Sequence, residues 1–384
     1  MDFSLNEVQR GVQRLVREFV DKEVMPVAVE LELEDTYPTQ LVGRMQELGF
    51  FGFPIPERYG GAGMDWVSYA ILMEELSRGW MSLTGVLGTH HITTWMIEKF
   101  GSEEQRQEYL PRLATGEWHS GMALTEPGCG SDAAALRTTA RREGEVYIVN
   151  GTKMFITNSE HGTMFSTFVR TDPHATPKHR GISCLLIHKG TPGFTVSRHL
   201  RKMGYRGLRT GELIFQDARV PCENLLGEEG KGFRYIMAGL EGGRINVAAR
   251  SVGLARAAFE ASIRHAQVRE TFGKPICQHQ AIQFKLADMA TRIEAARLLT
   301  HQAAALKDRG ERCDLQAGMA KLFASEVSEF CASEAVQIHG GMGFIQEGPV
   351  ERYFRDCKLL TVGEGSNEIQ RVIIARRLLE LYPV

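Results

Sequence analysis

One carboxylate in this chain lies where the sequence predicts a dry environment. Glu364 follows the apolar run 359–362 and precedes Gly365, a residue type that lets the backbone turn tightly. Burial raises the pKa of a carboxylate and makes it a stronger general base. A helix is expected to begin near Ser366, however, and a helix N-terminus favours the ionised form. The sequence leaves open which influence dominates, and an ordinary helix-capping Glu on the surface is the alternative.

A glycine-rich stretch is the second candidate for chemistry. It reads Thr-Glu-Pro-Gly-Cys-Gly-Ser at 125–131, and its glycines permit positive φ and close approach of the backbone. Amide N–H groups there could face a planar heterocycle, although ordinary turns have the same composition. In a later β-rich run Phe155 and Thr157 alternate, so both are expected on the same face of a strand.

Several common motifs are absent from the sequence. There is no GxGxxG after a strand, no Walker GxxxxGK[ST], no HExxH and no GxSxG. The nearest match, at 227–232, has the wrong spacing for a phosphate loop and is expected to cap a junction between strand and helix. Any dinucleotide should therefore bind outside a Rossmann unit.

Charge and cysteine content narrow the class of partner. Lys plus Arg number 45 and Asp plus Glu 47, so the formal charge of -2 gives no reason to expect nucleic acid or an anionic membrane. The seven cysteines have no CxxC pair and no zinc-like spacing. We expect reduced thiols, no metal site and a cytoplasmic protein, because no signal peptide and no apolar run of ~20 residues is present.

Periodicity divides the chain into three parts. The apolar residues of 5–20 repeat every 3.6 positions, Ser4 and Glu7 match a capping box, and further helical patterns follow at 39–49, 65–78 and 103–115. Short β-rich runs then occupy 146–149, 163–169, 182–187, 194–196 and 212–215.

Turn signals separate these runs at Asn150-Gly151 and at 189–193, and residues 172–180 are expected to form an exposed hairpin loop. Four long helical stretches follow, at 233–268, 279–309, 313–338 and 366–380, with Gly273 as a helix stop. The sequence thus predicts an α+β fold with an N-terminal α-helical domain (1–118), a middle β domain (119–232) and a C-terminal α-helical domain (233–384).

Five motifs together resemble those of the acyl-CoA dehydrogenases. They are MALTEPGCGSD at 122–132, TKMFITN at 152–158, RETFG at 269–273, QIHGGMG at 337–343 and GEGSNEIQ at 363–370. The motifs occur in the family's order and span most of the chain, so the resemblance is specific. It implies a β-barrel-like middle domain and a C-terminal four-helix bundle.

The resemblance implies FAD-dependent α,β-dehydrogenation of an acyl-CoA thioester to the trans-2-enoyl-CoA. Glu364 would abstract the α-proton, flavin N5 would take the β-hydride, and electrons would pass to an electron-transfer flavoprotein. An acyl-CoA oxidase or flavin monooxygenase on the same scaffold is the alternative enzyme. A non-catalytic acyl-CoA-binding protein is a third hypothesis.

The resemblance also implies the residues that bind FAD. Thr157 would bond to flavin N5, and Phe155 replaces the Trp of many members. Residues 269–272 would grip the ADP part of an FAD held mainly by a neighbouring subunit, and 337–341 would do so from a second one, which implies a homo-oligomer, typically a tetramer. The expected cofactor-binding residues are Met122, Leu124, Thr125, Gly130, Ser131, Phe155, Thr157, Arg269, Thr271, Phe272, Gln280, Gln337, Gly340, Gly341, Ser366 and Glu368.

By the same resemblance, one branch of the family carries its base on a helix just before an Arg, where this chain has Gly243. Glu364 is therefore the only candidate base. The segment 87–92 and Trp95 would line the acyl cavity, while His90 and His91 either contact substrate or are polar residues near a helix end. The expected substrate-binding residues are Ser131, Glu241, Arg244, His90, Gly363 and Gly365.

Three differences from the family bear on the acyl group. Gly363 replaces the Tyr of the straight-chain enzymes, which should widen the cavity, and Met81 replaces the Arg of glutaryl enzymes, which disfavours glutaryl-CoA. Arg209 meets either a charged substrate group or a surface carboxylate, and we favour the surface pair. Branched, cyclic and aromatic acyl groups stay open beside short and medium straight chains.

Overall fold

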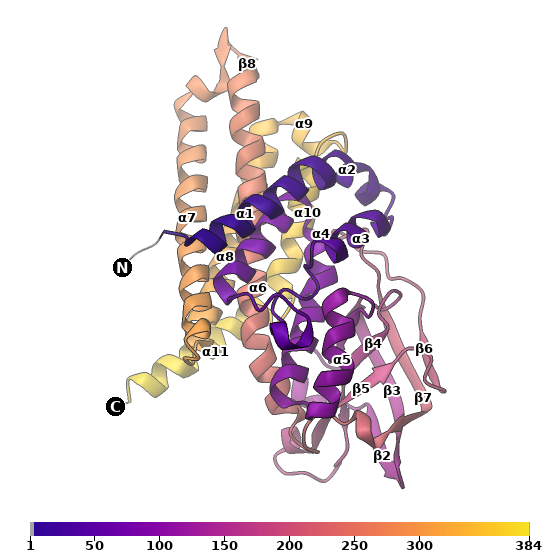
Figure 1. Cartoon of the computed structure of the whole chain (residues 1–384). Helices are drawn as coiled ribbons and strands as arrows, with labels where there is room; N and C mark the ends of the chain where they lie inside the picture. Colours follow the sequence, from indigo (N-terminus) through magenta and orange to yellow (C-terminus); the bar gives the residue numbers. More distant parts are fainter. Residues whose placement is uncertain (1–3, 384) are drawn as a thin grey trace.

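Helices form the first part of the fold. The computed structural model describes residues 4–383. Its first helical segments are α1 (Glu7–Phe19), the π-helical turn η1 (Val20–Val24), α2 (Met25–Leu33), α3 (Thr39–Glu47), α4 (Trp66–Phe100) and α5 (Glu103–Thr115). Figure 1 shows them beside the sheet and across the long C-terminal helices.

Two predictions for this part were wrong. The capping box of α1 is formed by Asn6 and Gln9, whose side chains bond reciprocally to backbone N–H groups at 2.9 and 3.0 Å, and not by Ser4 and Glu7. α4 extends well beyond the predicted 65–78. The buried Trp80 has φ −155° and ψ 110° and kinks the helix, which then continues to Phe100.

The middle part is a seven-stranded, curled sheet. Its strands are β1 (Ser120–Ala123), β2 (Thr139–Glu143), β3 (Val146–Thr157), β4 (Met164–Arg170), β5 (Ile182–His188), β6 (Phe194–Val196) and β7 (Thr210–Pro221). The strand order is β1-β4-β2-β3-β7-β6, with β5 paired to β4. The loop 172–180 joins β4 to β5, as predicted.

Asn150-Gly151 was predicted as a turn, but β3 continues through it. The register between β3 and β7 shifts at this point, as in a β-bulge. The Asn150 side chain holds the bulge, because its Nδ2 donates to Asp217 Oδ1 and its Oδ1 accepts from Asp217 N, both at 2.9 Å. A local turn signal was therefore overridden by pairing with a distant strand.

The last part is helical again. It consists of α6 (Gly232–Val268), α7 (Gln280–Asp308), α8 (Asp314–His339), α9 (Gly341–Phe344), α10 (Val350–Val362) and α11 (Asn367–Leu381). The predicted order helical, β, helical is confirmed, and so is the role of 227–232 as the junction before α6. The domain boundaries at 118 and 232 stay predictions.

A hairpin of β8 (Glu270–Thr271) and β9 (Lys274–Pro275) joins α6 to α7 at the end remote from the sheet (Figure 1). α6 ends at Val268, so Gly273 does not stop it. Phe272 and Gly273, with φ of 52° and 77°, form the two-residue turn of the hairpin.

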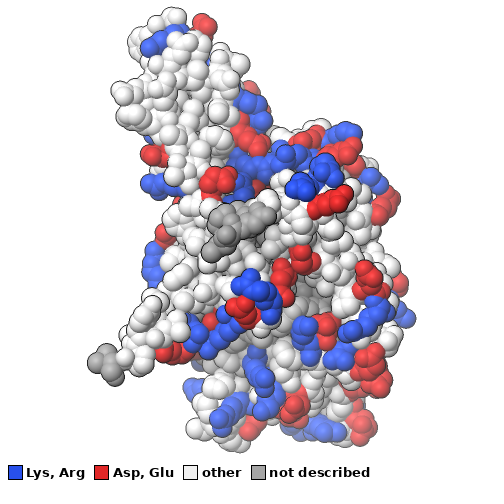
Figure 2. All heavy atoms as spheres, turned by 60° about the vertical axis from the view of Figure 1, so that its left-hand side comes forward, with Lys and Arg blue, Asp and Glu red and all other residues white. Residues whose placement is uncertain are grey.

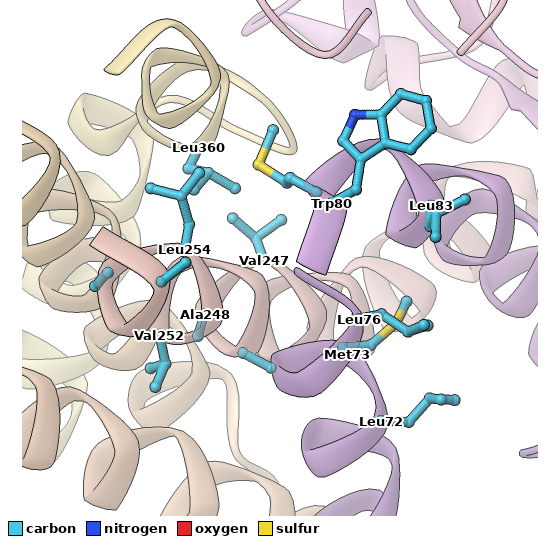
Figure 3. Close-up of a cluster of buried hydrophobic side chains, with 14 of the residues drawn as sticks. Leu72, Met73, Leu76, Trp80, Leu83, Val247, Ala248, Val252, Leu254 and Leu360 are labelled. Carbon is cyan, nitrogen blue, oxygen red and sulfur yellow. The ribbon is translucent and has the colours of Figure 1, made fainter. Parts of the chain in front are cut away.

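One hydrophobic core joins the two helical parts. Side chains of α4, α6 and α10 meet in it, among them Leu72, Met73, Leu76, Trp80, Leu83, Val247, Ala248, Val252, Leu254 and Leu360 (Figure 3). Each such large side chain contributes about 1.5–3 kcal/mol through burial. This core fixes α6 and α10 against each other, which matters because both carry parts of the site. Within residues 4–383, none of the helices combines the length and apolarity needed to span a bilayer.

Candidate active site

A four-residue loop carries Glu364. α10 ends at Val362 with Gly363 as C-cap, and α11 begins after the N-cap Ser366. Glu364 has φ 53° and Gly365 has φ 84°. Positive φ is strained for a residue with a side chain and concentrates at functional sites. The tight turn predicted at Gly365 is therefore present, and Glu364 also has a positive φ.

Two buried side chains hold this loop. Lys321 of α8 is fully buried, and its Nζ donates to Gly365 O at 3.0 Å and to Asn367 Oδ1 at 2.9 Å. Gln370 Nε2 donates to Gly365 O at 3.0 Å. Sequence reasoning missed Lys321, although its position among Ala317, Ala320 and Ala324 on one helix face is a usable signal.

The Glu364 carboxylate lies directly over α6. The residue as a whole is half-buried, but its Oε2 is buried and has no hydrogen-bond partner among the described residues. A Cβ built on Gly243 would lie 2.3 Å from this oxygen. The missing side chain at 243 therefore makes room for the carboxylate.

Burial decides the charge state of Glu364. It raises the pKa of this carboxyl to about 7, although Arg250, Lys321 and Arg244 each lower it. Desolvation therefore outweighs the opposing effect of these three cations. Burial also lowers the pKa of Lys321 to about 8. A carboxylate with a pKa near 7 is matched to proton abstraction at neutral pH.

A buried ion pair joins the first two motif segments. Lys153 Nζ lies 2.7 Å from Glu126 Oε1 and 3.2 Å from Leu124 O. The Glu126 carboxylate also accepts from the backbone N–H groups of Arg137 and Thr138, at 2.6 and 2.9 Å. Met154 N donates to the carbonyl oxygen of residue 125 at 2.8 Å. The structure thus brings 122–131 and 152–157 together.

Two glycines and one exposed aromatic side chain mark the surface of these segments. Gly128 and Gly130 do not adopt positive φ, contrary to the role suggested for their freedom, and a Cβ on either would meet no atom within 4 Å. Phe155 lies in a second bulge of β3, with φ 60° and 61% of its surface exposed. An exposed aromatic side chain beside open backbone is what a bound isoalloxazine would cover.

The other predicted residues of this region are placed as follows. Met122 in β1, Leu124, Thr125 and Thr157 are half-buried, and Ser131 is exposed. Thr157 pairs with Thr210 at the end of β3. Ser366 is half-buried at the start of α11, and Glu368 is exposed in its first turn. Their contacts with a cofactor stay predictions.

The remaining motif residues lie far from Glu364. Arg269 is the C-cap of α6, Thr271 and Phe272 belong to the β8–β9 hairpin, and Gln280 begins α7. The segment 337–341 spans the end of α8 nearby, where His265 and His339 stack with ring centroids 4.2 Å apart. About 25 residues of α6 separate Gly243 from Val268, which corresponds to ~37 Å. One chain therefore carries two separated sets of predicted cofactor contacts.

Both histidines of α4 are engaged by the protein. His90 is fully buried, and its ring nitrogens lie 3.3 Å from Phe51 O and 3.3 Å from Ser120 N. His91 Nε2 lies 2.9 Å from Phe50 O, and its Nδ1 has no partner. Burial lowers the pKa of His91 to about 4 and that of His90 well below its usual value. Their contact with substrate stays a prediction.

Three further charged residues were singled out from the sequence. Glu241 bonds within the chain, to Lys307 Nζ at 3.2 Å and to Cys313 N at 3.4 Å. Arg244 is buried, and its Nε has no partner. Arg209 pairs with Glu160 at 3.3 Å, so the predicted surface pair is confirmed.

Three family models match consecutive parts of the chain. They are the acyl-CoA dehydrogenase N-terminal domain at 6–117, the middle domain at 121–218 and the C-terminal domain at 230–379. The chain belongs to the acyl-CoA dehydrogenase family. Members are FAD-dependent oxidoreductases, so the predicted family, enzyme class and cofactor are confirmed.

Relatives of this acyl-CoA dehydrogenase match along its whole length. It is 47% identical to an acyl-CoA dehydrogenase of Bacillus subtilis, with 98% of this chain and 99% of the relative covered. The solved butyryl-CoA dehydrogenase of Megasphaera elsdenii has 39% identity and a TM-score of 0.96, with 99% and 100% covered. A chain from a structure of the electron transferring flavoprotein of Acidaminococcus fermentans has 42% identity and a TM-score of 0.95, with 99% and 100% covered. These similarities confirm the predicted fold class.

Proposed function

We propose that this chain oxidises an acyl-CoA thioester to the trans-2-enoyl-CoA, with Glu364 as the base. The observation that carries the proposal is the Glu364 carboxyl, whose Oε2 is buried without a partner and whose pKa burial raises to about 7. An unpartnered buried oxygen is costly in an interior and is explained by a ligand that supplies the partner. In an acyl-CoA dehydrogenase that ligand is the substrate.

The chain's own residues position and tune this base. The strained loop, held by Lys321 and Gln370, fixes the direction of the carboxylate, and Gly243 gives it room. Glu364 takes the α-proton of the bound thioester, and the β-hydrogen leaves as hydride. Bound FAD supplies the hydride acceptor at N5. Leu124, Thr125, Phe155 and Thr157 would hold its ring.

The separation along α6 supports a homo-oligomer. The predicted contacts at 269–272 lie ~37 Å along α6 from Gly243, which exceeds the reach of one extended FAD. These residues therefore serve the cofactor of another subunit, and a tetramer of shared sites follows the family's pattern. Phe272, which is 97% exposed, would be covered in such an assembly.

A short acyl group and an electron-transfer flavoprotein are the proposed substrate class and electron acceptor. Similarity to the butyryl-CoA dehydrogenase of Megasphaera elsdenii supports the first. Similarity to a chain from the Acidaminococcus fermentans electron transferring flavoprotein structure supports the second. Oxygen consumption by the reduced enzyme without any dye acceptor would instead favour an oxidase.

Anaerobic flavin reduction over a panel of acyl-CoA thioesters tests the proposal. Glu364→Gln should keep FAD and oligomer but reduce the flavin at least about two orders of magnitude more slowly, because the general base is lost. Glu143→Gln on exposed β2 is the control and should match wild type. A Glu364→Gln protein with near wild-type reduction would overturn the assignment.

A further inference from the structure

An arginine without an ion-pair partner lies in the interior near Glu364. Arg250 of α6 is 5% exposed, and no carboxylate of residues 4–383 forms an ion pair with it. Its guanidinium hydrogen-bonds to the Tyr205 side chain, and its Nε has no partner. Arg256, further along the same helix, shows the usual arrangement. It pairs with Glu74 and Glu75 at 2.9 Å and with Glu260 at 2.8 Å. Buried charges are normally paired in this way, whereas Arg250 has no carboxylate within ion-pair distance among the described residues.

Arg250 shares a helix face with the residue beneath the base. Gly243 and Arg250 are seven positions apart, which places them on one side of α6, two turns or ~10.5 Å from each other. The Arg250 guanidinium lies 5.1 Å from the centre of the Tyr205 ring. Among the charged groups that lower the pKa of Glu364, Arg250 has the largest effect. The Arg250 side chain therefore lies on the same side of α6 as Gly243, two helical turns further along, and faces the surroundings of the Glu364 carboxylate.

This region is polar. Asn246, between the two positions, donates from Nδ2 to Tyr69 OH at 2.5 Å, and its buried Oδ1 has no partner. The Tyr69 ring lies 5.3 Å from that of His91, whose Nδ1 is also unpartnered. A purely hydrocarbon acyl chain would leave these polar atoms and the Arg250 charge uncompensated.

We propose that Arg250 receives the distal carboxylate of a short dicarboxylic acyl-CoA, of roughly four to six carbons given the ~10.5 Å between Gly243 and Arg250. The inference rests on the proposed function and names its substrate class. Met81 removes the arginine found in glutaryl enzymes, but Arg250 supplies a cation from a different helix. In the reaction Glu364 takes the α-proton, the β-hydrogen leaves as hydride to bound FAD, and the distal carboxylate is unchanged.

Matched thioester pairs test this with the wild-type holoenzyme. Anaerobic flavin reduction is measured with succinyl-CoA against butyryl-CoA, glutaryl-CoA against valeryl-CoA and adipyl-CoA against hexanoyl-CoA. At least one diacid should exceed its monoacid partner about tenfold in kcat/KM. If every monoacid equals or exceeds its diacid, the inference is overturned while the dehydrogenase function stands. If no thioester of either kind reduces the flavin, both fail.

Two variants assign the effect to Arg250. Arg250→Gln should raise KM for the preferred diacid at least about tenfold and change KM for its monoacid partner less than threefold, with Arg250→Lys between them. In the Glu364→Gln background, calorimetry should show the same selective loss of affinity for the diacid without turnover.

Arg209→Gln, which removes only the pair with Glu160, is the control. An equal loss for both kinds of thioester would mean that Arg250 acts only through Glu364 and would overturn the proposal. The wild-type comparison decides the matter if the variants do not fold.

Discussion

Glu364 is a carboxyl whose surroundings disfavour its ionisation. Burial raises its pKa to about 7, and the base works only when ionised. We therefore expect kcat/KM for flavin reduction to rise about tenfold per pH unit below pH ~7 and to level off above it. Stopped-flow reduction at a series of pH values measures this. A flat profile through that range would show that substrate or cofactor resets the pKa.

The same pKa predicts how stability depends on pH. Below the ordinary value of 4.5 the carboxyl is protonated in both states, and between 4.5 and about 7 only the unfolded chain ionises, so the free energy of unfolding falls with rising pH. Glu364→Gln should remove this loss, which is on the order of 3 kcal/mol. Thermal unfolding of both proteins at pH 5 and pH 8 should show a larger gain for the variant at pH 8. An equal gain at both would contradict the linkage.

Lys321 both holds the Glu364 loop in place and puts a positive charge near the Glu364 carboxylate. Lys321→Met would break the hydrogen bonds to Gly365 O and Asn367 Oδ1 and remove a cation that lowers the pKa of Glu364. We expect a lower kcat at neutral pH and a midpoint of the pH profile shifted upward. Lys358→Met, on the exposed face of α10, is the control. A loss of stability without any shift of the midpoint would limit Lys321 to a structural role.

At the scale of elements, hydrophobic periodicity predicted the helices and strands that have one face in water. It missed segments whose polar residues are buried or that are buried on all sides. α10 was overlooked because Arg352 and Asp356 are buried on its inner face, where periodicity expects apolar residues. The second half of α4 is buried nearly all round, so it has no polar face to reveal a period. β3 and β7 form across a turn signal at Asn150. In each case tertiary contacts outweighed local preference.

The candidate site shows the same limit. Glu364 and the flavin segments could be predicted because short motifs carry them. Arg250 and Lys321 were missed, because a single cation in a helical stretch is typical of a solvated face. For Lys321, the alanines on the same helix face were the one signal of burial. Only the packing of α6 and α8 against their neighbours buries these two side chains and turns them toward the base.

Gly243 gives a test of how α6 and the Glu364 loop share space. An alanine Cβ would lie 2.3 Å from Glu364 Oε2, the mobile end of a side chain, so the fold should tolerate Gly243→Ala while the carboxylate moves. We expect flavin reduction to fall at least tenfold, with a melting temperature unchanged or raised by the helix propensity of Ala. Gly11→Ala on α1, where a Cβ meets nothing within 4 Å, is the matched control. Retained activity in Gly243→Ala would show that the carboxylate has room to spare.

At the scale of the whole molecule, exposed apolar side chains gather where the predicted ADP contacts lie. Figure 2 shows the column formed by the outer parts of α6 and α7 with few charged side chains. Its end carries exposed apolar residues, namely Val268, Phe272, Phe284, Met342 and Phe344. A monomer would leave this surface in water. The surface lies at the end of α6 remote from Glu364, where the predicted ADP contacts also lie.

Assembly and cofactor retention should therefore fail together. Phe272→Glu places a charge at the tip of the hairpin, on a side chain that is 97% exposed, so the fold of one chain should be unaffected. In a shared site the charge would instead be buried against a neighbouring subunit and its FAD, which is costly. We expect a smaller mass by light scattering and a loss of bound flavin at the same protein concentration. Val8→Glu on α1, 56% exposed, should change neither. If Phe272→Glu kept full assembly and full flavin, the hairpin would have no part in cofactor sharing.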